Sequence, residues 1–429
     1  MNHIACELNS ILEGTVAEKM LSNFGKRIYF PKGIIVQSAE AKKFAETANA
    51  TIGMAFHKGK PMILSALSDH LPYLSEAETV AYAPTAGVES VRELWFKHLL
   101  EKNPSLKAEF ISLPVVVPGI TAGISYMADI FFDKDQTVII NAPCWDNYSL
   151  IFEERREARL RNVSFLLDQS IDIVSITEAI EDEARTGEVR IVLNFPNNPA
   201  GYSPTSTEVD MLCECIYRAA DSGANVFVLC DDAYYGLLYE DNTCKESIFC
   251  RLAGLHDRVL AVKADGPTKE DYVWGLRIAF ITFGSKGLKK AHFDALIQKL
   301  MGTIRSSVSC SNTPAQFLLL KTFADQRTQD NKDRYFGILQ RRYLAVRRFI
   351  DAHQNHPVLK ALPFNSGYFM SFECTGISAE SLRRVLLDKY GIGVIALGEK
   401  YIRIAFSALN EEQITPVLDT IFKAAEELA

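Results

Sequence analysis

The sequence predicts an α/β protein in which helices flank a mostly parallel central sheet and a smaller α+β domain lies beside it. Two observations lead to this prediction. Short apolar runs rich in β-branched residues alternate with longer amphipathic stretches through the middle of the chain, which is the pattern of strands joined by crossover helices. The last third changes to long charged helical stretches, at 327–353 and 411–428, which indicates a separate unit.

The candidate buried strands are short apolar runs, at 114–117, 137–141, 189–194, 226–231, 259–263 and 278–283. The amphipathic stretches between them predict helices, for example at 122–132, 171–185 and 206–222. In the third of these helices, Val209, Leu212 and Ile216 follow helical spacing and are expected to face the core. Strands and helices thus alternate in the order that a parallel sheet requires.

The length of 429 residues alone suggests roughly three domains of about 150 residues each. The distribution of the motifs described below predicts two domains instead. We expect a large cofactor-binding domain over 71–310. We expect a small α+β domain that is formed from both chain ends, 1–70 and 311–429.

Composition excludes some classes of protein. Forty-eight per cent of the residues are hydrophobic and 23 per cent are charged, which is typical of a packed globular protein. The formal charge is −7, without long blocks of one sign, so neither nucleic acid nor an anionic membrane is expected as a partner. The uncharged segment 110–128 is interrupted by Pro114, Pro118, Gly119 and Gly123, so we expect a strand, a glycine turn and a helix there and not a membrane span.

The cysteines favour a reducing compartment. Nine cysteines are scattered along the chain, and no Cys or His cluster has the spacing of a metal site. Reduced thiols in a cytoplasmic protein are therefore expected, and no metal is expected. The first twenty residues lack the basic start and apolar stretch of a signal peptide.

The strongest local signal for chemistry is the segment KADGPTKEDYVWGLRIAF. Lys269 here follows a buried strand and a Gly-Pro pair. A lysine on a tight turn beside a core can be partly desolvated, which favours the neutral, nucleophilic amine. The ordinary alternative is a lysine whose charged end reaches the surface. Arg277, eight residues further on, opens the next strand, where a buried arginine needs an anion.

Three further segments place polar groups at the carboxyl ends of predicted strands, where α/β proteins bind ligands. In VVPGITAGIS, Gly119 precedes a helix start whose free N–H groups, with the hydroxyl of Thr121, would bind a phosphate. In NFPNNPAGYSPT, amide side chains offer donors to a ligand oxygen. In VFVLCDDAYYGLLY, Asp231 ends a strand and needs a cationic partner, with Tyr234 three residues further on. Taken singly, each segment is also compatible with an ordinary turn.

Taken together, the segments resemble a known family. The order of glycine turn, aromatic residue, NNPxG, DxxY, lysine with arginine at +8 and a late arginine is similar to that of the pyridoxal-phosphate-dependent aminotransferases of fold type I, class I and II. The resemblance runs from about Tyr82 to the C-terminus. It implies this family's fold, pyridoxal phosphate as the cofactor, and an α-amino acid and a 2-oxo acid as small-molecule partners. Lys269 matches the lysine that forms the internal aldimine and then moves the proton between the substrate α-carbon and C4′.

The resemblance also implies residues that contact each part of the cofactor. Asp231 matches the partner of the pyridinium nitrogen. Asn198 and Tyr234 match the donors to the 3′-oxygen. Trp145, in APCWDNY, matches the aromatic residue that stacks on the ring. The residues that match the phosphate site are Gly119, Ile120, Thr121 and Arg277.

Two further matches concern the subunit partner and the substrate. Tyr82, in VAYAPTAGVESVREL, resembles the tyrosine that reaches the phosphate of the neighbouring subunit, which implies a homodimer with shared active sites. Arg403, in YIRIAFS, resembles the arginine that binds the substrate α-carboxylate through paired hydrogen bonds, a geometry that lysine does not provide. Asn198 is expected to contribute to substrate binding as well.

The sequence departs from the family pattern in three places. Gly266 stands where many members have a phosphate-binding serine, so Thr268 or another group is expected to replace it. MILSALSDHLP, residues 62–72, replaces the glycine-rich strand near the N-terminal gate of the site. Arg305 could recognise a second carboxylate, although a surface or structural role is equally compatible with its spacing.

The sequence therefore predicts an aminotransferase, with Lys269, Asp231 and Tyr234 as catalytic residues. A pyridoxal-phosphate-dependent lyase or decarboxylase with the same cofactor site is an open alternative, since these enzymes differ in substrate orientation. A non-catalytic regulator of the same fold is a second alternative. Such regulators carry a DNA-binding unit before the fold, for which there are too few residues before Tyr82.

Overall fold

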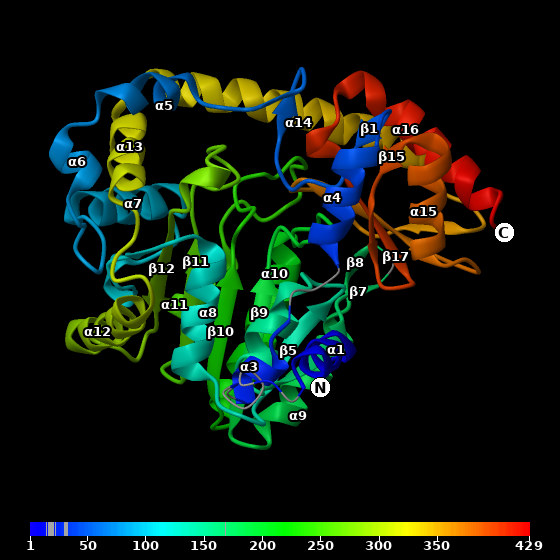
Figure 1. Cartoon of the computed structure of the whole chain (residues 1–429). Helices are drawn as coiled ribbons and strands as arrows, with labels where there is room; N and C mark the ends of the chain where they lie inside the picture. The colour runs from blue at the N-terminus through cyan, green and yellow to red at the C-terminus, as the bar shows by residue number, and fades with distance from the viewer. Residues whose placement is uncertain (14, 16–20, 22, 30–32, 168) are drawn as a thin grey trace.

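The computed structural model describes residues 1–13, 15, 21, 23–29, 33–167 and 169–429. The first twenty residues, for which no signal peptide is expected, lie partly outside these ranges. The largest feature is a seven-stranded sheet with the strand order β4-β12-β11-β10-β9-β5-β6 (Figure 1). All neighbours from β11 to β6 are parallel, and β12 is antiparallel to both of its neighbours. The predicted mostly parallel α/β sheet is confirmed.

The strands of this sheet are β4 (Val115–Val117), β5 (Thr137–Ala142), β6 (Arg159–Ser164), β9 (Glu188–Asn194), β10 (Asn225–Asp231), β11 (Val259–Asp265) and β12 (Ala279–Gly284). Every predicted strand occurs within about two residues of its expected ends. The edge strand β6 was missed because its sequence, RLRNVS, is largely polar. An edge strand can remain partly exposed, as β6 does, and so needs no apolar run.

Helices cover both faces of the large sheet. On one face lie α8 (Ile120–Phe131) and α12 (Lys290–Ser307), and on the other lie α9 (Ile173–Ala184), α10 (Ser206–Asp221) and α11 (Ile248–Ala253). Alternate residues of β10 serve the two cores: Val226 and Val228 pack towards α9 to α11, whereas Phe227 and Leu229 pack towards α8. The predicted helices are confirmed, but α8 begins earlier than expected, directly after Gly119.

A second sheet is built from the C-terminal third. Its order is β13-β14-β17-β16 and all of its pairs are antiparallel. Its strands are β13 (Leu359–Ala361), β14 (Phe369–Cys374), β16 (Ile395–Leu397) and β17 (Tyr401–Ala405), and its helices are α14 (Arg327–Ala352), α15 (Ala379–Tyr390) and α16 (Glu411–Glu426). The long helix α14 runs from beside α5 to this second sheet (Figure 1).

The remaining elements are shorter or join the two sheets. The helices are α1 (His3–Leu12), α3 (Asn23–Arg27), α4 (Ile34–Phe44), α5 (Ser65–His70), α6 (Glu76–Val80), α7 (Glu89–Lys102) and α13 (Thr313–Ala324). The two-residue strands are β1 (Ala48–Asn49), β2 (Phe56–His57), β3 (Lys60–Pro61), β7 (Leu166–Leu167), β8 (Ser170–Ile171) and β15 (Ile392–Gly393). No helix within the described ranges is both long enough and apolar enough to span a membrane.

The N-terminal segment contacts both parts of the molecule. Strand β1 pairs with β15, and the N–H of Ala405 donates to the carbonyl oxygen of Ala50 at 2.8 Å. Further towards the N-terminus, Arg27 forms an ion pair with Glu157, 3.1 Å away, which ties α3 to the large sheet. The division into domains 71–310 and 1–70 plus 311–429 stays a prediction.

Gly201 allows the loop after β9 to touch the second sheet. Its carbonyl oxygen accepts hydrogen bonds from the N–H groups of Asn365 and Ser366, both at 2.9 Å. Its φ of +80° lies in the left-handed region, and an added Cβ would lie 2.0 Å from the carbonyl oxygen of Phe369. Only glycine permits both this conformation and this approach.

We expect Gly201→Ala to lower the melting temperature more than Gly223→Ala. Both glycines have positive φ, so both substitutions strain the backbone by about 1–2 kcal/mol. A Cβ at Gly223 would have no described atom within 4 Å, whereas the clash at Gly201 should cost a further ~2 kcal/mol. Thermal unfolding followed by circular dichroism checks this difference. Equal melting temperatures for the two variants would contradict it.

Candidate active site

The carboxyl ends of the parallel strands surround a cavity of about 150 Å³. The sheet places the ends of β4, β5, β9, β10 and β11 at one edge, which is where open α/β sheets bind ligands. The residues that line the cavity are Ile120, Thr121, Trp145, Asn194, Asn198, Asp231, Ala233, Tyr234, Thr268, Lys269 and Arg277. The structure therefore brings together most of the site residues expected from the sequence.

Lys269 lies on the loop between β11 and β12, with its amine inside the cavity. The Nζ donates a hydrogen bond to the carbonyl oxygen of Gly53 at 3.0 Å and lies 5.0 Å from the centre of the Tyr234 ring. Burial, together with the positive charges of Arg403 and Arg277, lowers the pKa of Lys269 to about 7. A large fraction of the amine is therefore neutral, and so nucleophilic, near neutral pH.

The loop that carries Lys269 is held from several directions. The hydroxyl of Tyr368 donates to the carbonyl oxygen of Lys269 at 2.6 Å. Glu270 forms an ion pair with Lys102 of α7 at 2.5 Å, and Asp271 forms one with Lys332 of α14 at 2.7 Å. Because these partners come from separate elements, they fix the backbone at Lys269 and at the two residues that follow it.

Asp231 ends β10 and is almost fully buried. One carboxylate oxygen, Oδ2, accepts a hydrogen bond from the hydroxyl of Tyr148 at 2.6 Å, and Oδ1 accepts one from the N–H of Ala233 at 3.2 Å. Burial raises the pKa of Asp231 to about 6, while these hydrogen bonds and the charge of Lys269 oppose the rise. A buried carboxylate of this kind favours a cationic partner, such as a protonated ring nitrogen.

Two asparagines connect the strand ends to the substrate side of the cavity. The amide nitrogen of Asn194 donates to the carbonyl oxygen of Asp231, and its Oδ1 accepts from the backbone N–H of Asn198, both at 2.8 Å. The Oδ1 of Asn198 accepts from Arg403 at 3.0 Å. The amide nitrogen of Asn198 is therefore the group that it can offer to a ligand in the cavity.

The start of α8 forms an anion cradle. Gly119 precedes the helix with φ +95°, and a Cβ there would lie 2.3 Å from Nη2 of Arg277. The arginine can thus lie against the helix N-terminus, whose first N–H groups, at Ile120 and Thr121, have no partner within the helix. The expectation that Arg277 is buried and opens the next strand is wrong, because its side chain is exposed and it lies on the turn two residues before β12. The helix dipole and the guanidinium together favour a phosphate.

The structure gives a reason for the departure at Gly266. A Cβ at this position would lie 2.9 Å from the Cα of Ala279 in β12, so a serine would force the two strands apart. Thr268, two residues further on, lines the cavity and carries a hydroxyl. It can replace the missing serine as a donor.

Arg403 reaches the site from β17 of the second sheet. It is buried and donates to the carbonyl oxygen of Thr51 and to Asn198, both at 3.0 Å, and its guanidinium lies 4.2 Å from the centre of the Phe369 ring. Its Nε is buried without a hydrogen-bond partner among the described residues. Burial lowers the pKa of Arg403 to about 10. An unsatisfied, buried guanidinium N–H is the group that a substrate carboxylate would satisfy.

Gly119 and Arg403 adjoin the cavity lining through Arg277 and Asn198, whereas two other residues that the sequence singled out lie outside the cavity of this chain. Tyr82 is 92% exposed. Arg305 is exposed on α12 and contacts Ser309, so the surface alternative holds for it. Residues 62–72 do not line the cavity, and Gly53 lies beside Lys269 instead.

Sequence reasoning missed Gly53, Tyr148 and Asn194 as site residues. The position of Asn194 as the last residue of a predicted strand was an available signal. Tyr148 stands in the APCWDNY segment already singled out for Trp145, but nothing in the sequence indicates its contact with Asp231. The sequence around Gly53 gives no sign of its role, since its carbonyl oxygen contacts Lys269, which lies far away along the chain.

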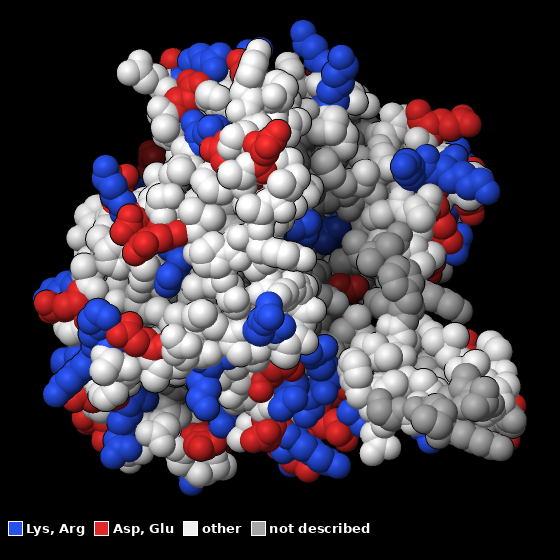
Figure 2. Space-filling model, turned by 60° about the vertical axis from the view of Figure 1, so that its left-hand side comes forward, with Lys and Arg blue, Asp and Glu red and all other residues white. Residues whose placement is uncertain are grey.

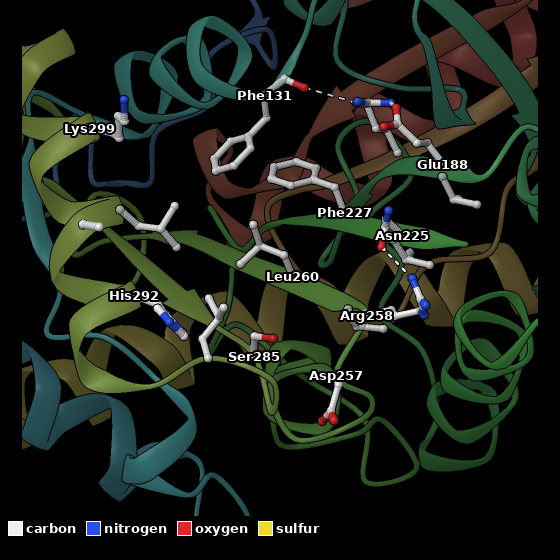
Figure 3. Close-up of a pocket in the computed structure, with 17 residues that line it drawn as sticks. Phe131, Glu188, Asn225, Phe227, Asp257, Arg258, Leu260, Ser285, His292 and Lys299 are labelled. Atoms are coloured by element: carbon white, nitrogen blue, oxygen red, sulfur yellow. Dashed lines mark hydrogen bonds and ion pairs between the residues drawn. The ribbon is translucent and has the colours of Figure 1, made fainter. Parts of the chain in front are cut away.

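The described residues also form cavities away from the candidate site. A cavity of about 520 Å³ lies at the amino ends of β9, β10 and β11, opposite the candidate site (Figure 3). Its walls are largely apolar, with Phe131 beside Phe227. On the face in Figure 2, acidic and basic side chains are interspersed, and basic side chains also lie within a hollow. Across the described ranges, no group of three or more His, Cys, Asp or Glu is placed to hold a metal ion.

Comparison with protein families defines the class. Residues 55–421 match the family described as aminotransferase class I and II. The chain therefore belongs to this family, and its activity is pyridoxal-phosphate-dependent transfer of an amino group. The comparisons give no support to the lyase or decarboxylase alternative. A search of curated proteins finds no match.

Solved structures share the fold. An aminotransferase from Anaerococcus prevotii is 22% identical with a TM-score of 0.83, over 94% of this chain and 98% of that one. An aspartate aminotransferase from Thermus thermophilus with maleate is 18% identical with a TM-score of 0.74, over 94% and 99%. An aromatic aminotransferase from Pyrococcus horikoshii is 17% identical with a TM-score of 0.72, over 91% and 99%. At these identities the likeness shows the fold.

The residues present fit pyridoxal phosphate. The cradle at Gly119 and Arg277 has room and donors for a phosphate, and it lies in one cavity with the buried carboxylate of Asp231 and the amine of Lys269. These groups match the three chemical demands of the cofactor: an anion site, a partner for the ring nitrogen and a primary amine for the aldehyde.

We expect Lys269 in the cofactor-free protein to react with acetic anhydride with a midpoint near pH 7. Only the neutral amine reacts, so modification should fall as the pH drops through the lowered pKa of about 7. Peptide mass spectrometry after brief exposure at several pH values measures this, with the exposed Lys286 as the reference for reagent loss. A rise in Lys269 modification only above pH 9 would show that its pKa is not lowered.

Proposed function

We propose that this protein moves the amino group of an α-amino acid to a 2-oxo acid, with Lys269 as its catalytic lysine. The observation that carries the proposal is a single cavity that joins a lysine of lowered pKa, a buried carboxylate and an anion cradle. Arg403 with its unsatisfied Nε lies beside this cavity.

Each residue has a role that follows from its position. Pyridoxal phosphate supplies an electron sink for the bond that breaks at the substrate α-carbon. Asp231 keeps the ring nitrogen protonated through its buried negative charge, and Arg277 with the start of α8 holds the phosphate. Lys269, once its amine is free, takes the α-proton and returns it to the cofactor carbon. Arg403 orients the substrate by its carboxylate.

The side chains of Tyr234 and Trp145 complete the proposed cofactor site. Tyr234 is buried. Its hydroxyl and the Nζ of Lys269 both face Gly53, since a Cβ added to this glycine would lie 3.6 Å from each of them. Burial raises the pKa of Tyr234, which keeps its hydroxyl protonated as a donor. Trp145 lines the cavity and offers a ring face for stacking.

We expect Lys269→Ala to reduce transamination by at least about 10³-fold, since it removes both the covalent attachment and the proton carrier. Amino-group transfer to 2-oxoglutarate measures this, with aspartate and aromatic amino acids as the first donors because two structural neighbours carry these names. Lys286→Ala, at an exposed position, is the matched control.

Covalent trapping tests the same assignment without turnover. Incubation with pyridoxal phosphate followed by borohydride reduction should label the peptide that contains Lys269 in the wild-type protein. The Lys269→Ala protein should carry no label there. Full activity of this variant, or trapping on another lysine, would overturn the proposed role.

The proposal includes a homodimer with shared active sites. Tyr82 lies 92% exposed at the end of a segment that also exposes Tyr73 and Val80, 77% and 80%. Exposed apolar side chains grouped in this way are typical of an interaction surface. A second copy of the chain would cover them and bring its Tyr82 to the phosphate of the neighbouring site.

We expect hybrid dimers of Lys269→Ala and Tyr82→Ala to regain activity. Each variant alone has two defective sites, whereas a hybrid has one site with both native residues, because the lysine and the tyrosine come from different subunits. Random mixing should restore about one quarter of the wild-type rate, since half of the dimers are hybrids with one native site. Refolding the two variants together and separately measures this. No gain on mixing would contradict a shared site.

We place the protein in the cytoplasm as part of the proposal. All nine cysteines are unpaired thiols. Cysteines are kept reduced in the cytosol. We also keep the division into a large domain, 71–310, and a small domain, 1–70 plus 311–429, as a proposal that the pairing of β1 with β15 supports.

A further inference from the structure

The hydroxyl of Tyr148 is the closest side-chain partner of the carboxylate that faces the proposed cofactor. The hydroxyl donates to Oδ2 of Asp231 at 2.6 Å, which is within the range of a hydrogen bond to a charged oxygen. Tyr148 has no exposed surface, and Asp231 is 3% exposed. The pair is therefore shielded from water, and water cannot replace this donor if it is removed.

The position of Tyr148 is fixed by its surroundings. It lies between β5 and a short π-helix, Ser149–Glu154, and its backbone N–H donates to the carbonyl oxygen of Trp145 at 3.2 Å. Its ring packs edge-on against Trp145, with centroids 5.5 Å apart, and lies tilted against Phe152, with centroids 6.2 Å apart. A phenol held in this way has little freedom to turn away from Asp231.

The two oxygens of Asp231 have different partners. Oδ2 is taken by Tyr148, while Oδ1 accepts the longer hydrogen bond of Ala233, at 3.2 Å. A carboxylate oxygen can accept more than one hydrogen bond, so the oriented carboxylate of Asp231 can still accept a hydrogen bond from a ligand N–H. Without Tyr148, only the bond to Ala233 would fix the rotation of the carboxylate.

Several charged or titratable groups act on Asp231. Burial and the charge of Asp232, the next residue, raise its pKa to about 6, although the hydrogen bonds of Tyr148 and Ala233 and the charge of Lys269 oppose the rise. Tyr234 also lies near the pair, and the pKa of the Tyr148 phenol is raised well above its usual range by burial and by Asp231. The phenol therefore stays protonated and donates its hydrogen bond throughout the working range of pH.

We propose that Tyr148 is a positioning residue that keeps Asp231 ionised and aimed at the cofactor ring, so that the site binds the cofactor at lower pH than it otherwise could. The inference rests on the proposed function only in that pyridoxal phosphate occupies this cavity. It goes beyond that function because Tyr148 does not line the cavity and acts through Asp231.

Tyr148→Phe removes the one hydroxyl and keeps the buried ring. The probe is pyridoxine 5′-phosphate, which has no aldehyde and so cannot bond to Lys269. Its Kd for the cofactor-free protein is measured by titration calorimetry from pH 5.5 to pH 8.5. The ratio of the variant and wild-type values cancels the titration of the probe itself. Tyr126→Phe is the matched control, because Tyr126 is also buried and its hydroxyl contacts Ser307 at 2.9 Å between α8 and α12, outside the cavity lining.

Loss of the donor should raise the pKa of Asp231, so the loss of affinity on acidification should begin at higher pH. We expect the acid limb of the Kd profile to move up by about one pH unit, which makes Kd about fivefold weaker near pH 6 and about eightfold weaker at pH 5.5. At pH 8.5 the two proteins should bind almost equally, and Tyr126→Phe should follow the wild type throughout. Coincident profiles, or a uniform weakening at every pH, would overturn the proposal.

Two further measurements keep the test decisive. If Tyr148→Phe does not fold, 3-fluorotyrosine placed at position 148 keeps the shape and makes the phenol a stronger donor, so the acid limb should move to lower pH. In an Asp231→Asn background, Tyr148→Phe should no longer shift the profile. Failure of the proposed function would appear separately, as normal pyridoxine phosphate binding without borohydride trapping at Lys269.

Discussion

The active-site geometry depends on the hydrogen-bond register between β9, β10 and β11. In this register Asp231 lies opposite Asn194 on one side and Ala264 on the other. A slip of one residue would turn every side chain of β10 to the opposite face, and the Asp231 carboxylate would leave the cavity. The register is held by apolar packing on both faces, since the neighbouring residues Val228 and Leu229 are fully buried in different cores. The position of the carboxylate therefore follows from core packing more than from the loops around it.

The charges of the site are balanced for ligands. Arg277 and Arg403 bring two guanidinium groups to the cavity and Lys269 adds a partly charged amine, whereas Asp231 is the one acidic side chain among the described lining residues. A phosphate and a substrate carboxylate would supply the missing negative charge. Deeper in the core, Lys263 is paired with Asp232, so it contributes no free positive charge. The protein thus separates a paired structural lysine from Lys269, the proposed catalytic lysine, six residues later.

The sequence indicated the parts of the site that lie near a strand end and carry a distinctive residue type, such as Asp231 and Lys269. The parallel sheet could be predicted because its strands are buried on both faces and read as apolar runs, whereas β6 at the edge carries little of that signal. Gly53 and Tyr148 were missed for a different reason. Each acts through a contact between residues that are distant in the sequence. The carbonyl oxygen of Gly53 accepts a hydrogen bond from Lys269, and the hydroxyl of Tyr148 donates one to Asp231. Neither contact leaves a local sequence pattern.

Segments from both the N-terminal and the C-terminal parts of the chain meet at the Arg403 side of the site. Arg403 comes from β17 and donates to the carbonyl oxygen of Thr51, and Lys269 donates to that of Gly53. Neutral carbonyl groups therefore hold both cations, and the Nε of Arg403 still has no partner within the described residues. A substrate carboxylate offers a charged acceptor, which forms a stronger hydrogen bond than a neutral carbonyl does. In the proposed function, the free energy spent on burying an incompletely bonded guanidinium would be recovered on binding, which would select for ligands that carry this carboxylate.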